Sequence, residues 1–157
     1  MKLSNNLTLA EVVKSNTAIR RGIDNTPTDA HIENLKYVAE KVFQPLREHF
    51  GVPIYISSGY RSKALNEAIG GSKTSFHSHG MALDLNQDGR NRGVSNADVF
   101  YYIKDNLPYS ELIWEFGNED KPDWVHVAIA KGREDEKNAK IAYRVDGKTQ
   151  YKKWDRS

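Results

Sequence analysis

The stretch SFHSHGMALDLN, residues 75–86, sets two histidines, a glycine and an aspartate around a short apolar run. Side chains alternate between the two faces of a strand, so MALDLN predicts a strand with Leu83 and Leu85 on one face and Asp84 on the other. Aspartate and glycine are depleted in ordinary strands. Their position here therefore indicates a functional loop and strand.

A second stretch, WVHVAI at residues 124–129, alternates in the same way. Its aliphatic residues form a core face, which leaves His126 on the opposite face. With Asp84 and a third group from the loop before it, His126 would complete a set of two histidines and one aspartate. Such a set with an open fourth position is typical of catalytic zinc sites. On spacing alone either His77 or His79 can be the third ligand, and a hydrogen-bonded, metal-free histidine loop is the alternative.

The sequence favours neither of two other kinds of metal site, a thiolate site or a calcium loop. The chain has no cysteine, so any metal must be held by histidine, aspartate or glutamate. DLNQDG at residues 84–89 resembles the first half of a calcium-binding EF-hand loop, but the twelfth position, where glutamate is needed, is Ser95. No helix is predicted before this loop either, so calcium is not favoured.

Composition predicts one soluble globular domain over residues 1–157, because 38% of the 157 residues are apolar and 28% are charged. No apolar run is long enough for a membrane helix, and MKLSNNLTLAEVV lacks the apolar core of a secretory signal. We therefore expect a cytoplasmic product. Residues 131–157 contain nine Lys and Arg against five Asp and Glu, a basic tail that would suit an anionic polymer or simply a solvated surface. No interleaved aromatic and basic platform predicts nucleic-acid binding.

Periodicity and turn residues predict an α+β fold, with N-terminal helices packed on a central antiparallel sheet that carries the metal site. A long helix within residues 26–51 should kink at Pro45 and end at Gly51. Asp146 and Gly147 predict a type I′ turn in a β-hairpin within the tail. The other predicted elements are strands at 53–57, 111–116 and 124–129, and helices at 62–71 and from Ser95 to about Asn106.

Five ordered blocks resemble the zinc D-Ala-D-Ala carboxypeptidase family, whose relatives include phage endolysin peptidases and the zinc-binding hedgehog signalling domain. The blocks are SSGYRS (57–62), LNEAIGGS (65–72), SFHSHGMALD (75–84), LIWEFG (112–117) and WVHVA (124–128). The resemblance covers roughly residues 5–130 and does not extend to the tail. The N-terminal part of the chain is similar to the branch of the family that is common in phages and prophages.

The family pattern Ser-x-His-x-x-Gly-x-Ala-x-Asp, with a later Trp-x-His, can be matched to this chain. The resemblance implies that His77, Asp84 and His126 hold zinc and that Ser75 lies at the substrate. Phe76 departs from the pattern, where glutamine is usual, and this change affects a pocket wall without removing a ligand.

Amide hydrolysis also requires a base and a group that stabilises the substrate. Arg61 follows a predicted strand, and its guanidinium can bind a substrate carboxylate or the developing oxyanion, the alternative being a structural ion pair. For the base we prefer Glu115, because a hairpin would bring it across from Trp124 or His126. Asp123 is the second candidate: it lies three residues before His126, an offset used by some branches of the family, although strand alternation places it on the opposite face.

The resemblance implies a monomeric zinc peptidase that hydrolyses amide bonds in peptidoglycan stem peptides, as a D-Ala-D-Ala carboxypeptidase or as an endolysin-type endopeptidase. It would stay in the cytoplasm until released to the cell wall, as a phage or prophage lysin does. The alternative is a zinc-containing cell-wall-binding or interaction module that does not catalyse.

Overall fold

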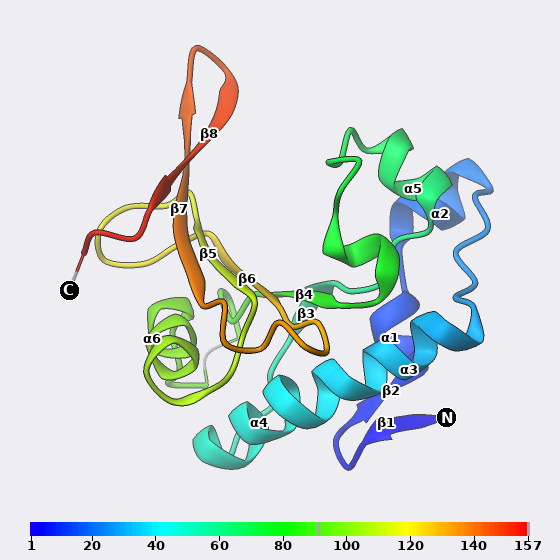
Figure 1. The fold of residues 1–157 in the computed structure, drawn as a ribbon, viewed down its shortest axis with the longest axis horizontal. Coiled ribbons are helices and arrows are strands. Elements are labelled where there is room, and N and C mark those ends of the chain that lie inside the picture. Colours follow the sequence, from blue (N-terminus) through cyan, green and yellow to red (C-terminus); the bar gives the residue numbers. More distant parts are fainter. Residues whose placement is uncertain (91, 157) are drawn as a thin grey trace.

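Helices mainly from the first half of the chain and strands mainly from the second half build an α+β fold in the computed structural model, which describes residues 1–90 and 92–156 (Figure 1). The helices are α1 (Leu9–Val13), α2 (Asn16–Arg21), α3 (Asp29–Val38), the π-helical η1 (Ala39–Phe43), α4 (Gln44–Phe50), α5 (Lys63–Ala68), the 3₁₀ turn η2 (Phe76–His79) and α6 (Asn96–Asn106). The strands are β1 (Lys2–Ser4), β2 (Leu7–Thr8), β3 (Ile56–Ser58), β4 (Ala82–Leu85), β5 (Glu111–Glu115), β6 (Trp124–Ala128), β7 (Asn138–Val145) and β8 (Lys148–Lys153). Within the described residues, no helix has the length and apolarity that crossing a membrane requires.

The central sheet has six strands in the order β3-β4-β6-β5-β7-β8. Its pairs are antiparallel, as predicted, except that β5 and β7 run parallel. The exception follows from the topology. Both edges of β6 are already occupied, by β4 and β5, so the next strand along the chain, β7, pairs with the free edge of β5 instead. The connection from β6 returns the chain so that β7 runs in the same direction as β5.

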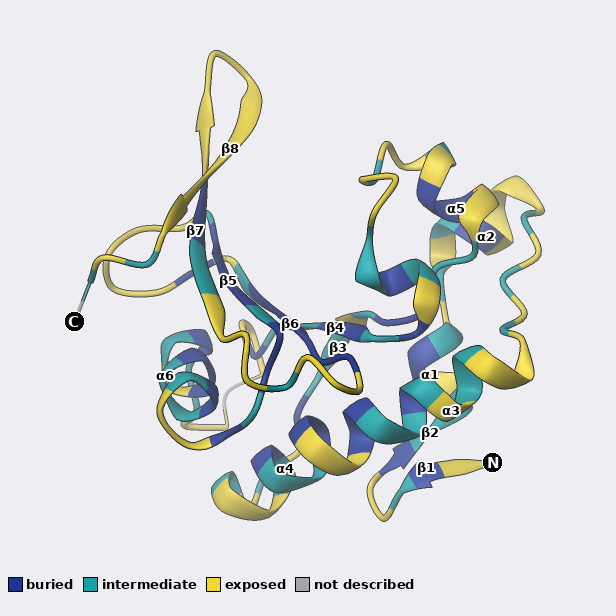
Figure 2. Ribbon diagram, viewed as in Figure 1, coloured by how far each residue is buried: buried dark blue, intermediate teal, exposed yellow. Residues whose placement is uncertain are grey.

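Strand alternation gives the sheet one apolar face and one polar face. On the apolar face, the fully buried Trp114 ring packs edge-on against Phe100 of α6, with ring centroids 5.2 Å apart. Helix α3, the π-helical η1, α4 and α6 supply most of the helical side chains in the core, and Figure 2 shows buried residues along β4, β6 and β5. The polar face carries Asp84 and His126, which are paired across β4 and β6, so this face holds the candidate site.

The long N-terminal helix is continuous through α3, η1 and α4, and a π-helical turn precedes Pro45 where the sequence predicted a kink. Proline removes one N–H and clashes with the carbonyl four residues earlier. The wider turn accommodates it: the N–H of Gln44 donates to the Ala39 carbonyl, five residues back. The helix ends at Gly51, as predicted, in a left-handed conformation with φ +68°.

The strand predicted at residues 53–57 is shorter, since β3 begins only at Ile56. The reason is that the side chain of Gln87, and not a neighbouring strand, forms hydrogen bonds with the backbone before Ile56. The amide of Gln87 accepts from the N–H of Tyr55 at 2.8 Å and donates to the Pro53 carbonyl at 3.1 Å. The chain before Ile56 therefore satisfies its backbone without entering the sheet.

The predicted hairpin is present as β7 and β8, joined through Asp146 and Gly147. Both turn residues have positive φ, +51° and +76°, as a type I′ turn requires. After the hairpin, Trp154 packs against Phe100 at 4.6 Å and Trp114 at 5.3 Å between ring centroids. The end of the tail is thus attached to the aromatic part of the core.

Candidate metal centre and active site

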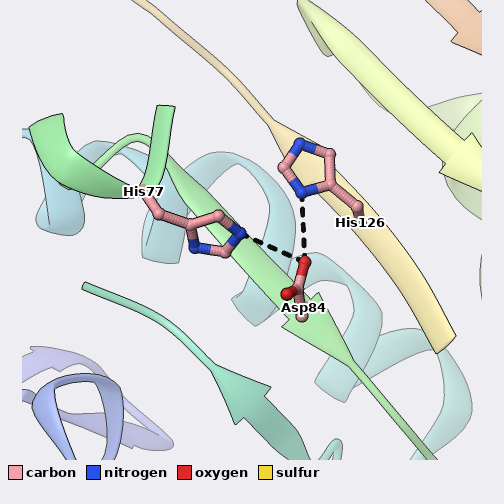
Figure 3. Close-up of side chains that lie close together, drawn as sticks. All are labelled: His77, Asp84 and His126. Atoms are coloured by element: carbon pink, nitrogen blue, oxygen red, sulfur yellow. Dashed lines mark hydrogen bonds and ion pairs between the residues drawn. The ribbon is translucent and has the colours of Figure 1, made fainter. Parts of the chain in front are cut away.

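Three side chains from three elements converge on the polar face of the sheet (Figure 3). His77 comes from η2, Asp84 from β4 and His126 from β6, and one potential ligand atom of each lies within 4.8 Å of the others. Asp84 and His126 are direct cross-strand partners, which explains their proximity. The His77 and His126 side chains are buried, whereas Asp84 is partly accessible.

Local structure places His77. The Ser75 hydroxyl accepts from the His77 N–H at 3.2 Å and caps the 3₁₀ turn at its start. Gly80 ends the turn with φ +72°, and a Cβ there would meet the His31 carbonyl oxygen at 2.6 Å. Only glycine fits this close approach to α3. The two residues thus turn the chain so that His77 faces Asp84.

Each histidine directs one ring nitrogen at Asp84 and the other at a fixed acceptor. His77 Nε2 and His126 Nδ1 lie 3.2 Å and 3.0 Å from the same Asp84 oxygen. His77 Nδ1–H donates to the Gly59 carbonyl at 2.7 Å, and His126 Nε2 is 2.9 Å from Glu111 Oε1. Outer partners of this kind orient metal-ligating histidines and select the tautomer.

These residues fit a zinc ion. Ligand atoms around a tetrahedral zinc at about 2.0–2.1 Å are separated by roughly 3.3 Å. The nitrogen–oxygen distances of 3.0 Å and 3.2 Å at Asp84 are close to this value. Two imidazole nitrogens and one carboxylate oxygen are also the donors that zinc takes in catalytic sites, with one position left open.

The electrostatics of the cluster are those of a site built for a cation. Burial alone would raise the pKa of Asp84, but the charge of His77 and the hydrogen bonds from both histidines hold it well below its ordinary value. Burial would lower the pKa of His126, and its hydrogen bonds to Asp84 and Glu111 outweigh that effect and raise it to about 10. A metal-free His126 therefore keeps a proton between two carboxylates, and a bound metal cation would replace it.

Glu115 and Arg61 lie in the same cleft, which has a volume of about 1160 Å³. Glu115 is paired with Trp124 across β5 and β6, one of the two positions predicted, and is 7% exposed. Burial raises its pKa to about 7, and the charges of Asp84 and Glu111 act in the same direction. A buried carboxyl that titrates near neutrality beside a metal cluster is suited to proton transfer.

Arg61 lines the cleft and has a buried donor that is unsatisfied. Its Nε is buried and has no hydrogen-bond partner in the described part of the chain. Burial lowers the pKa of the guanidinium, and the charges of Asp84 and Glu115 oppose that effect. A buried donor without an acceptor is costly.

The structure does not bring Asp123 together with the other predicted site residues. Its side chain is exposed and is not among those that line the cleft. Its backbone N–H donates to the Glu115 carbonyl at 2.8 Å, and strand alternation continues through it, so the preceding turn does not redirect it. His79 is also exposed: it lies at the rim of the cleft and is not part of the cluster.

Sequence reasoning missed Glu111 and Lys140. Glu111 Oε1 contacts His126 Nε2 at 2.9 Å, and Glu111 Oε2 accepts from Lys140 Nζ at 2.9 Å. The alternation in ELIWE places Glu111 on the same face as Glu115, and that signal was sufficient to find it. Lys140 belongs to the tail, where no motif marks it.

Comparison with models of protein families places the chain. A family model described as Peptidase M15 matches residues 5–128, which include all three metal-site residues, Arg61 and Glu115. No curated protein matches the chain. The family is zinc-dependent. The chain belongs to the Peptidase M15 family, that of the zinc D-Ala-D-Ala carboxypeptidases.

Proposed function

We propose that this chain is a zinc-dependent peptidase that hydrolyses amide bonds in the peptide stems of peptidoglycan. The observation that carries the proposal is the cluster of His77, Asp84 and His126 in a cleft that also contains Glu115 and Arg61. Family membership supports a peptidase. The nearby acid supports hydrolysis over binding alone, because binding needs no group that transfers a proton.

A zinc ion held by His77, Asp84 and His126 would polarise the scissile carbonyl and acidify the attacking water. The protein's own contribution begins with orientation. The Gly59 carbonyl and the Glu111 carboxylate each accept from the outer nitrogen of one histidine, which leaves the inner nitrogen free to ligate.

Glu115 is the proposed general base and, later, the general acid. It takes a proton from the attacking water while the water oxygen bonds to the carbonyl carbon. It then gives this proton to the amide nitrogen as the carbon–nitrogen bond breaks, so the products are a carboxylic acid and an amine. With its pKa raised to about 7, Glu115 can hold and release a proton near neutral pH. Asp123 is not favoured because it lies outside the cleft.

Arg61 is proposed to bind the carbonyl oxygen or a carboxylate of the substrate. Its buried Nε lacks an acceptor in the described residues, and its backbone N–H donates to the His77 carbonyl at 3.2 Å. The backbone of Arg61 is therefore attached to the backbone of a metal ligand. A donor held in place before the reaction stabilises developing negative charge without reorganisation.

The test is hydrolysis of purified cell walls by the zinc-loaded protein, measured as new amine ends. We expect amine release that a chelator abolishes and added zinc restores. Glu115→Gln should lower the rate by about 10²–10⁴-fold, the usual contribution of general acid–base catalysis. Glu119→Gln is the matched control, because Glu119 is exposed on the loop after the same strand. Absence of new amine ends with zinc present would refute the proposed function, and full activity of Glu115→Gln would refute the base.

The masses of the released fragments identify the bond. Free D-Ala indicates a carboxypeptidase, whereas separated stem fragments indicate an endopeptidase. Release to the wall in the manner of a phage lysin is part of the same proposal. If the wild type releases no new amine ends and Glu115→Gln and Asp123→Asn both behave as wild type in every assay, a wall-binding module explains the metal site better.

A further inference from the structure

The C-terminal hairpin, β7 and β8, continues the cleft beyond the part of the chain that matches the family. The match ends at residue 128, and the hairpin spans residues 138–153. Cross-strand partners share a face, and the register pairs Glu115 with Ala142 and Ala142 with Tyr151. These three residues form one row across three strands, and Tyr151 and Arg144 line the cleft.

Residues of the hairpin and of the segment from α5 to η2 line the cleft, and Figure 1 shows how these two segments are arranged. The hairpin rises on one side of β4, β6 and β5, and the segment from α5 to η2 rises on the other. Figure 2 shows that the outer part of the hairpin is exposed. A substrate in the cleft would therefore lie between these two walls, over the metal residues.

Two basic residues of the hairpin, Lys140 and Arg144, line the cleft, and Arg144 is the one of the two that is free to bind a ligand. Lys140 is already paired with Glu111 at 2.9 Å, and on another part of the cleft rim Arg133 is paired with Glu136 at 2.7 Å. Arg144 forms no ion pair with any residue that the structure describes. Its exposed guanidinium keeps its hydrogen-bond donors available.

An aromatic platform holds Arg144 in place. The centre of its guanidinium lies 3.8 Å from the centroid of the Phe116 ring, a close cation–π contact. Phe116 has φ +58°, a conformation that costs free energy in a bulky residue and is kept only where the surroundings enforce it. Its N–H donates to the Ala142 carbonyl at 3.0 Å, and its ring packs on Trp124 with centroids 5.5 Å apart. Stacking leaves the edge of the guanidinium open, and this edge matches a carboxylate.

We propose that the hairpin forms a carboxylate-binding subsite of the cleft, in which Arg144 binds a free carboxylate of the substrate peptide and Tyr151 packs against the peptide beside it. Tyr151 is 55% exposed and is the cross-strand partner of Ala142, whose small side chain leaves room next to Glu115. The choice of a stem peptide as ligand rests on the proposed function.

The subsite is tested by binding, in a Glu115→Gln background so that the peptide is not consumed. The probe is a synthetic stem pentapeptide ending in D-Ala-D-Ala, titrated into the zinc-loaded protein in a calorimeter. Adding Arg144→Gln should raise the Kd about tenfold, the usual loss of one charge-assisted hydrogen bond. Lys148→Gln is the matched control and should change the Kd by less than about twofold. It removes the same charge from the same hairpin, but Lys148 pairs with Val145 and lies on the opposite face.

Peptides with one carboxylate amidated at a time identify the group that is bound. For the peptide that lacks this carboxylate, Arg144→Gln should no longer change the Kd. Tyr151→Ala should weaken all the peptides alike, because it removes an apolar contact. The subsite would be overturned if Arg144→Gln and Lys148→Gln changed the Kd equally, or if Arg144→Gln still raised the Kd for every amidated peptide. It would also be overturned if the pentapeptide did not bind. Failure of the wild type to hydrolyse cell walls would refute the proposed function and leave this binding result standing.

Discussion

Replacing Glu115 by glutamine should stabilise the zinc-free protein at alkaline pH and leave its stability almost unchanged at acid pH. The carboxyl is only 7% exposed, and burial together with the charges of Asp84 and Glu111 raises its pKa to about 7. In the unfolded chain the pKa returns to 4.5. Glutamine has nearly the same shape as a protonated glutamate and never ionises.

The magnitude follows from these two pKa values. The folded protein binds the Glu115 proton more tightly than the unfolded chain, so its contribution to stability is fully present below pH 4.5 and is lost as pH rises through about 7. The gap between 4.5 and about 7 corresponds to about 3 kcal/mol in the free energy of unfolding. Glu115→Gln avoids this loss and should be more stable than wild type by about that amount above roughly pH 8.

The assay is urea unfolding of chelator-treated protein, followed by tryptophan fluorescence at several values between about pH 4.5 and 8.5. The stability difference between Glu115→Gln and wild type should rise from near zero to about 3 kcal/mol across this range. Glu119→Gln, on the exposed loop, should give a flat line near zero. A Glu115→Gln difference that does not change with pH would refute the reasoning, since burial would then impose no cost on the ionised carboxyl. Zinc should reduce the difference, because a nearby cation lowers the pKa of Glu115.

Three further outcomes follow from the structure. His77→Ala should lose stoichiometric zinc, whereas His79→Ala should keep it, as measured by metal analysis after gel filtration. The reverse result would show that His79, and not His77, is the metal ligand. Glu111→Gln should weaken zinc binding about 10–100-fold in a competition with a chromophoric chelator, because it removes the charge that orients His126. An unchanged affinity would mean that this hydrogen bond does not support the ligand. Trp154→Ala should lower the free energy of unfolding by about 2 kcal/mol in denaturant titrations, since it removes the aromatic contacts of the tail with Phe100, Tyr101 and Trp114. No loss of stability would mean that the tail packs only loosely.

Much of the site was predictable because short stretches of sequence determine on which face of a strand each side chain lies. Alternation within MALDLN and WVHVAI was sufficient to put Asp84 and His126 on a polar face. The turn residues Asp146 and Gly147 predicted the hairpin for a similar reason, since few residues adopt positive φ readily. The choice between His77 and His79 was different: spacing left it open, and the family resemblance decided it.

The candidate base depended on register. Eight residues, 116–123, connect β5 to β6, and a loop of this length does not determine which residues pair across the strands. The observed pairing of Glu115 with Trp124 brings Glu115 into the cleft and leaves Asp123 on the face of Val125. A shift of one residue would have exchanged the faces on one strand, so the choice is made by tertiary packing of the apolar face.

The role of the tail had no local signal. Lys140 and Glu111 are 29 residues apart, and they meet only because β7 adds in parallel to the free edge of β5. A parallel pair depends on the path of the whole connection between its strands, which composition and periodicity do not encode. The same pairing sets Arg144 two residues beyond Ala142, on the face of Glu115. The basic charge of the tail, which in the sequence suited either a solvated surface or an anionic polymer, therefore includes one side chain that the fold directs to the cleft.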